Sequence, residues 1–349
     1  MIRIGVAGAG WVSGHHLEAW RQLAERATVV AIADPDLAAG RSRADAFGIP
    51  AVYGSVDAML DAESGESGKS INAIDVAAPR EFHGPICRMA ADRGLAILCQ
   101  KPLAPTLDEA EELVAAVEGR CRLMVHENWR FRPHYRRIAD WLGAGHIGDV
   151  RTVSLSLLTS GLLADADGQL PALVRQPMLA TLDRMLVMEV LIHHVDTLRF
   201  LLGPLQLAGA TLGRSCKMVR GEDRAALLLT TDTGAAVTIV GDFAAYGYPP
   251  QQRDQLEIFG TRGRVSLDGD RLRRFGAAGP RTLQEPEEDV VIDLAADYKA
   301  SYLGALTHFL DRLADGRPFE TGPEDNLQTL RIVEAAYRVG GGSVPSLSR

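Results

Sequence analysis

A glycine-rich turn near the N-terminus constrains the fold of this chain more than any other feature. An apolar, strand-like segment at residues 2–7 runs directly into Gly8-Ala9-Gly10, and apolar residues at helical spacing follow from Val12 onward. Asp34 ends the next apolar segment, well beyond the turn. A strand, a glycine turn, a helix and an acid after the second strand are the parts of a dinucleotide-binding βαβ unit. The turn therefore predicts a Rossmann domain.

The same turn predicts how a dinucleotide binds. Two glycines let the backbone approach a pyrophosphate, and the following helix offers free N–H groups and the positive end of its dipole. Ser13 stands where the fingerprint has its third glycine. The alternative is a tight turn that holds no ligand. We expect five residues of this segment at the cofactor: Gly8, Gly10, Trp11, Val12 and Ser13.

Asp34 bears on which dinucleotide binds. A carboxylate at this position binds the adenosine ribose hydroxyls and repels a 2'-phosphate. Arg41 and Arg43 lie further along and could bend back toward such a phosphate. We expect NAD as the cofactor, with NADP possible.

The pattern of strands and helices divides the chain in two, as expected for 349 residues. Strands alternate with helices up to residue 126, which predicts a parallel sheet. A helix at 133–142 then precedes strand-like runs separated by tight turns, which predicts a mostly antiparallel, open sheet with one exposed face. The expected fold class is α/β, with a Rossmann domain at residues 1–125 and an α/β domain for substrate binding and oligomerisation at residues 126–349.

Lys101 is the first candidate for proton transfer. It follows a predicted buried strand at 95–99 and precedes Pro102. This order places it at the carboxyl end of a parallel strand, which is the edge where ligands bind in open α/β sheets. The alternative is an exposed loop lysine.

A predicted apolar helix around residues 188–202 carries the other candidates. Glu189, His193 and Asp196 share one helix face, at spacings of four and three. Burying such groups is unfavourable unless they are used or paired, and pairing with Arg199 is the structural alternative. A metal site would need further ligands that the sequence does not supply, so we expect no metal.

Composition excludes several kinds of partner. The net charge of -8 argues against nucleic acid and anionic membranes. No apolar run approaches the ~20 residues that span a bilayer. The four cysteines are scattered and form no CxxC motif, so we expect reduced thiols in a cytoplasmic protein.

Together these segments resemble the Gfo/Idh/MocA family (glucose–fructose oxidoreductase, inositol dehydrogenase and rhizopine catabolism). The resemblance covers nearly the whole chain. It is carried by Gly8-Ala9-Gly10, Ala78-Pro79-Arg80-Glu81-Phe82-His83, Gln100-Lys101-Pro102-Leu103, Asn128-Trp129-Arg130-Phe131-Arg132-Pro133, His193-His194-Val195-Asp196 and residues 309–318. Two positions depart from the family pattern: Gln100 replaces the glutamate of the EKP motif, and Val190 replaces a glycine.

The resemblance implies a role for individual residues. Lys101 takes the place of the EKP lysine and His193 that of the downstream histidine, with Glu189 and Asp196 beside it as orienting carboxylates. The implied cofactor contacts add Ala78, Pro79, His83, Gln100 and Lys101. The expected substrate contacts are Asn128, Arg130, Arg184 and His193. The arginines would suit a carboxylate of the substrate, and the alternative for each arginine is a solvated surface position.

The expected activity is hydride transfer between NAD(P) and a secondary alcohol of a sugar, polyol or sugar acid. Either His193 or Lys101 would take the hydroxyl proton, and the sequence leaves both open. Two alternatives use the same fold: a redox-neutral enzyme that oxidises and re-reduces a sugar, and a cofactor-binding regulator. The family also implies a homodimer or homotetramer joined through the second sheet.

Overall fold

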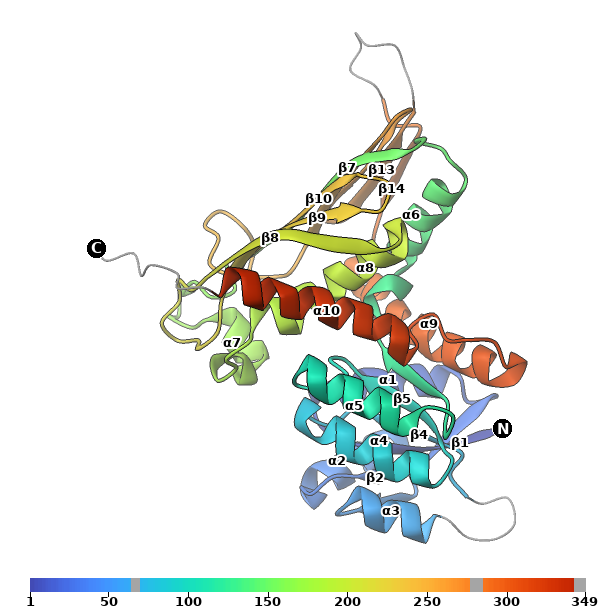
Figure 1. Ribbon diagram of the computed structural model, residues 1–349. Helices are drawn as coiled ribbons and strands as arrows, with labels where there is room; N and C mark the ends of the chain where they lie inside the picture. The colour runs from blue at the N-terminus through green and yellow to red at the C-terminus, as the bar shows by residue number, and fades with distance from the viewer. Residues whose placement is uncertain (64–69, 277–284, 342–349) are drawn as a thin grey trace. The chain divides into compact units, whose positions relative to one another are not determined.

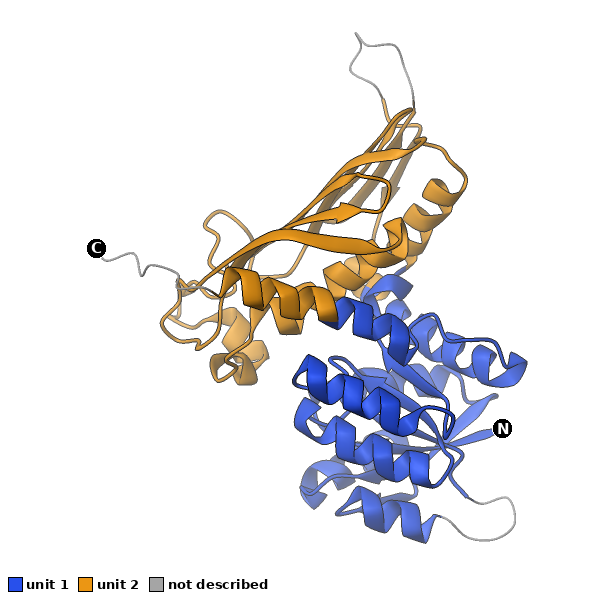
Figure 2. Ribbon diagram, in the orientation of Figure 1, with its two compact units in different colours: residues 1–132, 298–330 blue, residues 133–297, 331–349 orange. Residues whose placement is uncertain are grey.

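The computed structural model describes residues 1–63, 70–276 and 285–341. The chain forms two compact units (Figure 2). Unit 1 comprises Met1–Arg132 and Tyr298–Leu330, and unit 2 comprises Pro133–Asp297 and Arg331–Arg349.

Unit 1 is built on a six-stranded parallel sheet in the order β3-β2-β1-β4-β5-β6 (Figure 1). Its strands are short and almost entirely apolar, as expected for a sheet covered on both faces. They are β1 (Ile2–Ala7), β2 (Ala27–Ala33), β3 (Ala51–Tyr53), β4 (Ala73–Val76), β5 (Ala96–Gln100) and β6 (Leu123–His126). The helices between them are α1 (Trp11–Gln22), α2 (Leu37–Phe47), α3 (Val56–Ala62), α4 (His83–Asp92) and α5 (Leu107–Val117), with 3-10 turns at Arg80–Phe82 and Trp129–Phe131.

The C-terminal helices contribute to unit 1. Helix α9 (Leu294–Asp315) buries Leu306 and Phe309 in a core that also holds Leu17 and Trp20 of α1. Helix α10 (Pro323–Gly340) begins in unit 1 and ends in unit 2. The sequence placed residues 298–330 in the second domain, whereas their apolar side chains pack on the parallel sheet. The domain boundary between residues 125 and 126 stays a prediction.

Unit 2 contains an eight-stranded sheet in the order β14-β13-β12-β11-β7-β10-β9-β8. Strands β7 and β10 pair in parallel and every other pair is antiparallel. The strands are β7 (Val150–Leu158), β8 (Leu205–Gly213), β9 (Arg224–Thr231), β10 (Ala236–Asp242), β11 (Asp254–Gly260), β12 (Arg264–Asp268), β13 (Arg271–Phe275) and β14 (Glu288–Val291). The helices are α6 (Pro133–Gly143), α7 (Pro171–Arg175), a 3-10 turn at Pro177–Ala180, a π-helix at Leu186–Leu191 and α8 (Ile192–Leu202).

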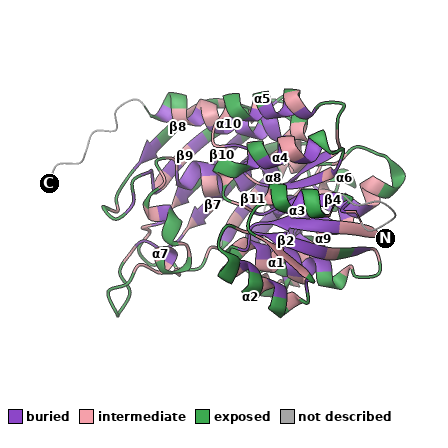
Figure 3. Cartoon of the chain, turned by 90° about the horizontal axis from the view of Figure 1, so that it is seen from below, coloured by how far each residue is buried: buried purple, intermediate pink, exposed green. Residues whose placement is uncertain are grey.

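Alternate residues of this sheet face opposite sides. Val153, Leu155 and Leu157 of β7 are fully buried, while the residues between them are exposed or half-buried. The same alternation is visible along the strands in Figure 3. The open face still carries Leu228 and Val240, which are 46% and 39% exposed.

The predicted α/β class is confirmed, with a parallel Rossmann sheet and a second, mostly antiparallel sheet. Thr106 caps α5, because its side chain accepts the Glu109 N–H. Gly203 ends α8 with φ 84°. Among the described residues, no helix is long and apolar enough to cross a membrane.

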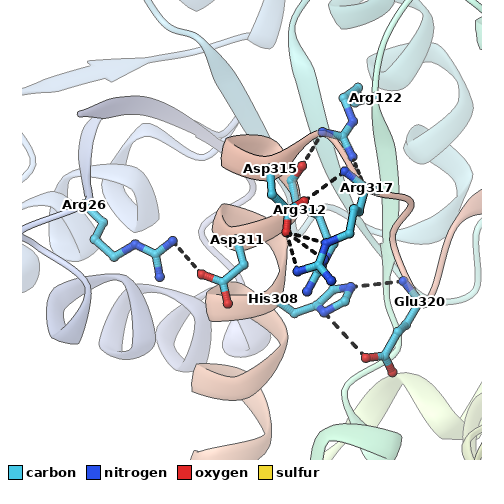
Figure 4. A network of polar contacts seen from close by, with 8 residues as sticks. All are labelled: Arg26, Arg122, His308, Asp311, Arg312, Asp315, Arg317 and Glu320. Atoms are coloured by element: carbon cyan, nitrogen blue, oxygen red, sulfur yellow. Dashed lines mark hydrogen bonds and ion pairs between the residues drawn. The ribbon is translucent and has the colours of Figure 1, made fainter.

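A polar network ties the end of α9 to β6 (Figure 4). The Arg122 guanidinium donates to the backbone carbonyls of Arg312 and Arg317, and it lies 4.6 Å from the centre of the Phe319 ring. Asp315 accepts from Arg312 and Arg317 at 2.7 Å. Arg122 thereby places a charged donor against one carbonyl in the last turn of α9 and one just beyond it.

We expect Arg122→Ala to lower the free energy of unfolding by about 2 kcal/mol, because charge-assisted bonds to carbonyls are lost. Asp311→Ala is the control. It removes an ion pair to Arg26 whose side chains are 39% and 46% exposed, and should cost about 0.5 kcal/mol or less. Urea denaturation measures both, and equal losses would show that Arg122 does not hold the end of α9.

Candidate dinucleotide and proton-transfer sites

The glycine turn joins β1 to α1 and leaves room beside its backbone. Gly8 has φ +105°, and a Cβ there would lie 2.7 Å from the Ala77 carbonyl oxygen, so this position requires glycine. A Cβ on Gly10 would meet no protein atom within 4 Å. Gly10 is the N-cap of α1 and supplies no side-chain cap. The N–H groups of the first turn thus lie beside open space, which is what a bound phosphate needs.

Opposite charges flank this turn. The Asp34 carboxylate accepts the N–H of Ala9 at 2.7 Å and that of Asp36 at 2.8 Å. Arg43 of α2 donates to the carbonyls of Ala9 and Gly10 at 3.3 and 3.0 Å. Burial, followed by the nearby His16, lowers the pKa of His15, which packs edge-on against Trp11. These residues fit a dinucleotide: an acid for ribose hydroxyls, with a cation beside it.

Lys101 lies directly after β5, at the carboxyl edge of the parallel sheet. The loop after β4 approaches this edge, because His83 hydrogen-bonds to the carbonyls of Ala78 and Pro102 at 2.8 and 2.9 Å. His83 is buried, and its two hydrogen bonds connect the loop after β4 to the loop after β5. Contact of Ala78, Pro79 or His83 with the cofactor stays a prediction.

The residues after β6 bond to the C-terminal helices. Asn128 donates to the Ser301 hydroxyl of α9 at 2.6 Å. Arg130, whose side chain is 5% exposed, pairs with Asp325 at 2.8 Å and donates to the Glu320 carbonyl. Substrate binding by Asn128 and Arg130 stays a prediction.

In unit 2, the predicted continuous helix around Glu189 and His193 is divided. Leu186–Leu191 forms a π-helix that carries Glu189, and α8 begins at Ile192. Such π-turns occur frequently at functional sites. His193 is 9% exposed, and Asp196 is fully buried with an oxygen 4.0 Å from Arg199. Thus Asp196 has the partner that the structural alternative named.

His194 points to a different environment. It is fully buried, and its Nε2 lies 2.9 Å from Asp254 Oδ1. The other Asp254 oxygen accepts the Tyr135 hydroxyl at 2.7 Å. These contacts give His194 a structural role inside unit 2.

Glu222 and Tyr337 hold the start of the π-helix, and sequence analysis did not identify either. Glu222 accepts the N–H groups of Met185 and Val187 at 3.3 and 2.9 Å. The Tyr337 hydroxyl donates to Glu222 at 2.6 Å and accepts the Met188 N–H. Burial and the Glu222 carboxylate raise the pKa of Tyr337. No local pattern marks these residues, since the contact joins positions far apart in sequence.

Arg184 contacts helix α10 close to Tyr337. It forms a two-point ion pair with Glu334 at 2.6 and 3.2 Å, and its guanidinium lies 4.7 Å from the centre of the Tyr337 ring. Arg184 was expected at the substrate. It has a carboxylate partner within unit 2, and substrate contact stays a prediction.

Open cavities lie at the opposite edge of the parallel sheet. One of about 530 Å³ is lined by Ile2, Asn72, Ala96 and Arg122, which lie at or just before the amino ends of their strands. Ligands of open α/β sheets bind at the carboxyl ends, so we do not assign the dinucleotide to this cavity. Among the described residues, no group of three or more His, Cys, Asp and Glu side chains could hold a metal ion.

We expect Gly10→Val to abolish dinucleotide binding and leave the fold intact, because the side chain enters only the open space beside the turn. Gly8→Val is the contrasting variant and should destabilise unit 1, since it meets backbone atoms at positive φ. Isothermal titration and circular dichroism measure the two effects. Unchanged affinity in Gly10→Val would remove the assignment of this turn to the phosphates.

We expect Glu222→Ala to lower the free energy of unfolding by about 2 kcal/mol, because two backbone N–H groups and a hydroxyl lose a buried acceptor. Tyr337→Phe should cost about 1 kcal/mol, since Glu222 keeps its backbone donors. Hydrogen exchange of the Val187 amide should accelerate strongly only in Glu222→Ala. Equal exchange in wild type and Glu222→Ala would contradict a capping role.

Known proteins are similar to this chain over nearly its whole length. Residues 2–127 match the model of the Gfo/Idh/MocA oxidoreductase family with an NAD-binding Rossmann fold. Residues 135–266 match the C-terminal domain of the same family. The D-apiose dehydrogenase of Paraburkholderia graminis is 33% identical over 341 residues, covering 95% of this chain and 85% of that protein.

Two further proteins, at lower sequence identity, are also similar to nearly the whole chain. The inositol 2-dehydrogenase of Rhizobium meliloti is 25% identical, covering 97% of this chain and 96% of that protein. An oxidoreductase from Agrobacterium radiobacter, solved in complex with NAD+, L-tartaric acid and magnesium, superposes with a TM-score of 0.84 at 28% identity, covering 98% and 96% of the two chains. This chain therefore belongs to the Gfo/Idh/MocA family of oxidoreductases with an NAD-binding Rossmann fold, as its sequence motifs predicted.

Proposed function

We propose that this protein oxidises a secondary alcohol of a sugar, polyol or sugar acid with NAD as the hydride acceptor. The observation that carries the proposal is the uncapped start of α1 beside the open space at Gly10, in a chain of this family. The relatives named as D-apiose and inositol dehydrogenases support a polyhydroxylated substrate.

The proposed cofactor contacts follow from the turn. The N–H groups of Trp11, Val12 and Ser13 bind the pyrophosphate, because they open a helix with no side-chain cap. Asp34 receives the adenosine ribose and favours NAD over NADP. Arg43 lies at the same turn, and its charge would offset that preference.

In the proposed mechanism, the start of α1 and Asp34 would hold NAD, which would supply the hydride acceptor for the substrate carbon. His193 or Lys101 takes the hydroxyl proton, and the other group stabilises the forming carbonyl oxygen. Glu189 and Asp196 orient the imidazole. A cationic nicotinamide near an ammonium would favour the neutral amine, which would suit Lys101 as the base.

The proposed substrate contacts are Asn128, Arg130 and Arg184. The arginines suit a carboxylate, and a relative was solved with L-tartaric acid. Each of the three already bonds to the protein, so substrate contact requires lone pairs or N–H groups that those bonds leave available.

We further propose a cytoplasmic homodimer or homotetramer. All four cysteines are free thiols, which supports a reducing compartment. Leu228, Val240 and Phe259 lie on the exposed face of the second sheet, and such a surface suits burial against another copy. Light scattering at micromolar concentration is expected to give a multiple of the 37.6 kDa chain mass, and a monomer mass would contradict the proposal.

A substrate screen tests the reaction. Sugars, polyols and aldonates are incubated with NAD and, separately, with NADP, and NADH or NADPH absorbance is followed. We expect NADH to accumulate with turnover and NAD to be preferred. Product without accumulated NADH would favour the redox-neutral alternative.

Variants test the proton-transfer assignment. Lys101→Met and His193→Ala should each lower kcat by about 10²–10⁴-fold and leave NAD affinity nearly unchanged. His194→Gln is the control. It changes the neighbouring histidine of the same helix, and the glutamine amide keeps an N–H donor for Asp254. A crippled His194→Gln beside an active His193→Ala would show that the reactive histidine is misassigned.

A further inference from the structure

Gln100 is the residue at which this chain departs from the EKP motif of its family. It is the last residue of β5, it is 7% exposed, and Lys101 follows it. Its Oε1 accepts the backbone N–H of Lys101 at 2.7 Å. Its Nε2 lies 3.0 Å from His16 Nε2 and 3.3 Å from His126 Nδ1.

These contacts determine which way the Gln100 amide faces. A backbone N–H can only donate, so the amide oxygen must face Lys101. The NH₂ group then faces the two imidazoles, and because it can only donate, both ring nitrogens must be acceptors. His16 Nε2 and His126 Nδ1 therefore carry lone pairs.

The proton of His16 consequently lies on its other nitrogen. Nδ1 is 2.9 Å from Asp75 Oδ2, and this oxygen also accepts the Trp20 indole N–H at 2.7 Å. His16 and Asp75 are both fully buried. A continuous series of hydrogen bonds thus runs from Asp75 of β4 through His16 of α1 and Gln100 to the backbone of Lys101.

We propose that Gln100 is a positioning residue for Lys101. Its amide holds His16 in the Nδ1–H form and fixes the Lys101 backbone. Gln100 thereby holds Lys101 in a constant position relative to α1, the helix that follows the glycine turn. The consequence for catalysis rests on the role of Lys101 in the proposed function. The hydrogen-bond assignment does not depend on that role.

The chemistry explains why glutamine suits this chain. A carboxylate at position 100 could still accept the Lys101 N–H, but it offers no donor to the lone pairs of His16 and His126. It would also add a second buried negative charge to the series that contains Asp75, which is unfavourable without a new proton. Glutamine is therefore matched to two imidazoles that accept at the nitrogens facing it.

Nitrogen-15 NMR of the histidine rings in the full-length protein tests the assignment without any activity. We expect His16 to be protonated at Nδ1 alone at neutral pH, with its signals identified by their loss in His16→Gln. Gln100→Glu should add a proton at Nε2. A wild-type His16 protonated at Nε2, or at both nitrogens, would overturn the proposal, as would an unchanged His16 spectrum in Gln100→Glu.

Kinetics tests the positioning role. Gln100→Met keeps side-chain length and removes both polar contacts, so kcat should fall about 10-fold or more with NAD affinity changed only a few-fold. Trp20→Phe is the control, since it removes the other Asp75 donor and leaves the series to Lys101 intact. His16→Phe combined with Gln100→Met should lose little more than Gln100→Met alone.

The outcomes separate the two proposals. If Gln100→Met keeps full kcat while Lys101→Met is inactive, Gln100 does not position the lysine. If Lys101→Met is fully active, the proposed function of Lys101 is wrong, and the NMR result still decides the hydrogen-bond series. Additive losses in the His16 and Gln100 double variant would also overturn the positioning role.

Discussion

The buried Asp75 carboxylate is the constraint on which the arrangement of unit 1 depends. It lies in β4, beside β1 at the centre of the parallel sheet, and no part of it reaches solvent. A charge in such a place is unfavourable without hydrogen-bond donors, and His16 and Trp20 of α1 both donate to one of its oxygens, Oδ2. These bonds fix which face of α1 lies over β4.

The return of the chain completes this unit. Helix α9 packs Tyr302 and Phe309 against the same core that receives Trp20. The Tyr302 ring also lies 5.0 Å from His126 at the end of β6, and Ser301 accepts from Asn128. His126 and Asn128, which follow Lys101 in the chain, are thus contacted by a helix far from them in sequence. An isolated N-terminal segment would leave these apolar and polar groups uncovered.

In unit 2, a buried carboxylate again holds a helix in place, here the π-helix at Leu186–Leu191. A π-helix is less favourable than a regular helix and occurs mostly as a single turn. Here the Glu222 carboxylate and the Tyr337 hydroxyl accept the N–H groups at its start, and the Glu222 backbone carbonyl accepts that of Leu186. The proposed proton-transfer residues Glu189 and His193 follow directly. The buried Glu222 therefore holds the backbone that leads into the proposed reactive side chains.

The sequence alone determined the features that depend on local pattern. The glycine turn, the Thr106 cap, the stop at Gly203 and the alternation along β7 each follow from residues within a few positions of one another. Local pattern marks the three-residue β3 and the glycine-containing β8 only weakly, because short or glycine-containing strands carry little periodicity. Asp75 is a charged residue inside an apolar strand, and this pattern indicates a buried polar contact without identifying the partner. Only the tertiary structure decided the hydrogen-bond partners of the buried and half-buried polar residues. The pairs are His16 with Gln100, Asp254 with His194, Glu334 with Arg184 and Tyr337 with Glu222. Burial makes each pairing necessary, but packing between distant segments selects which donor meets which acceptor.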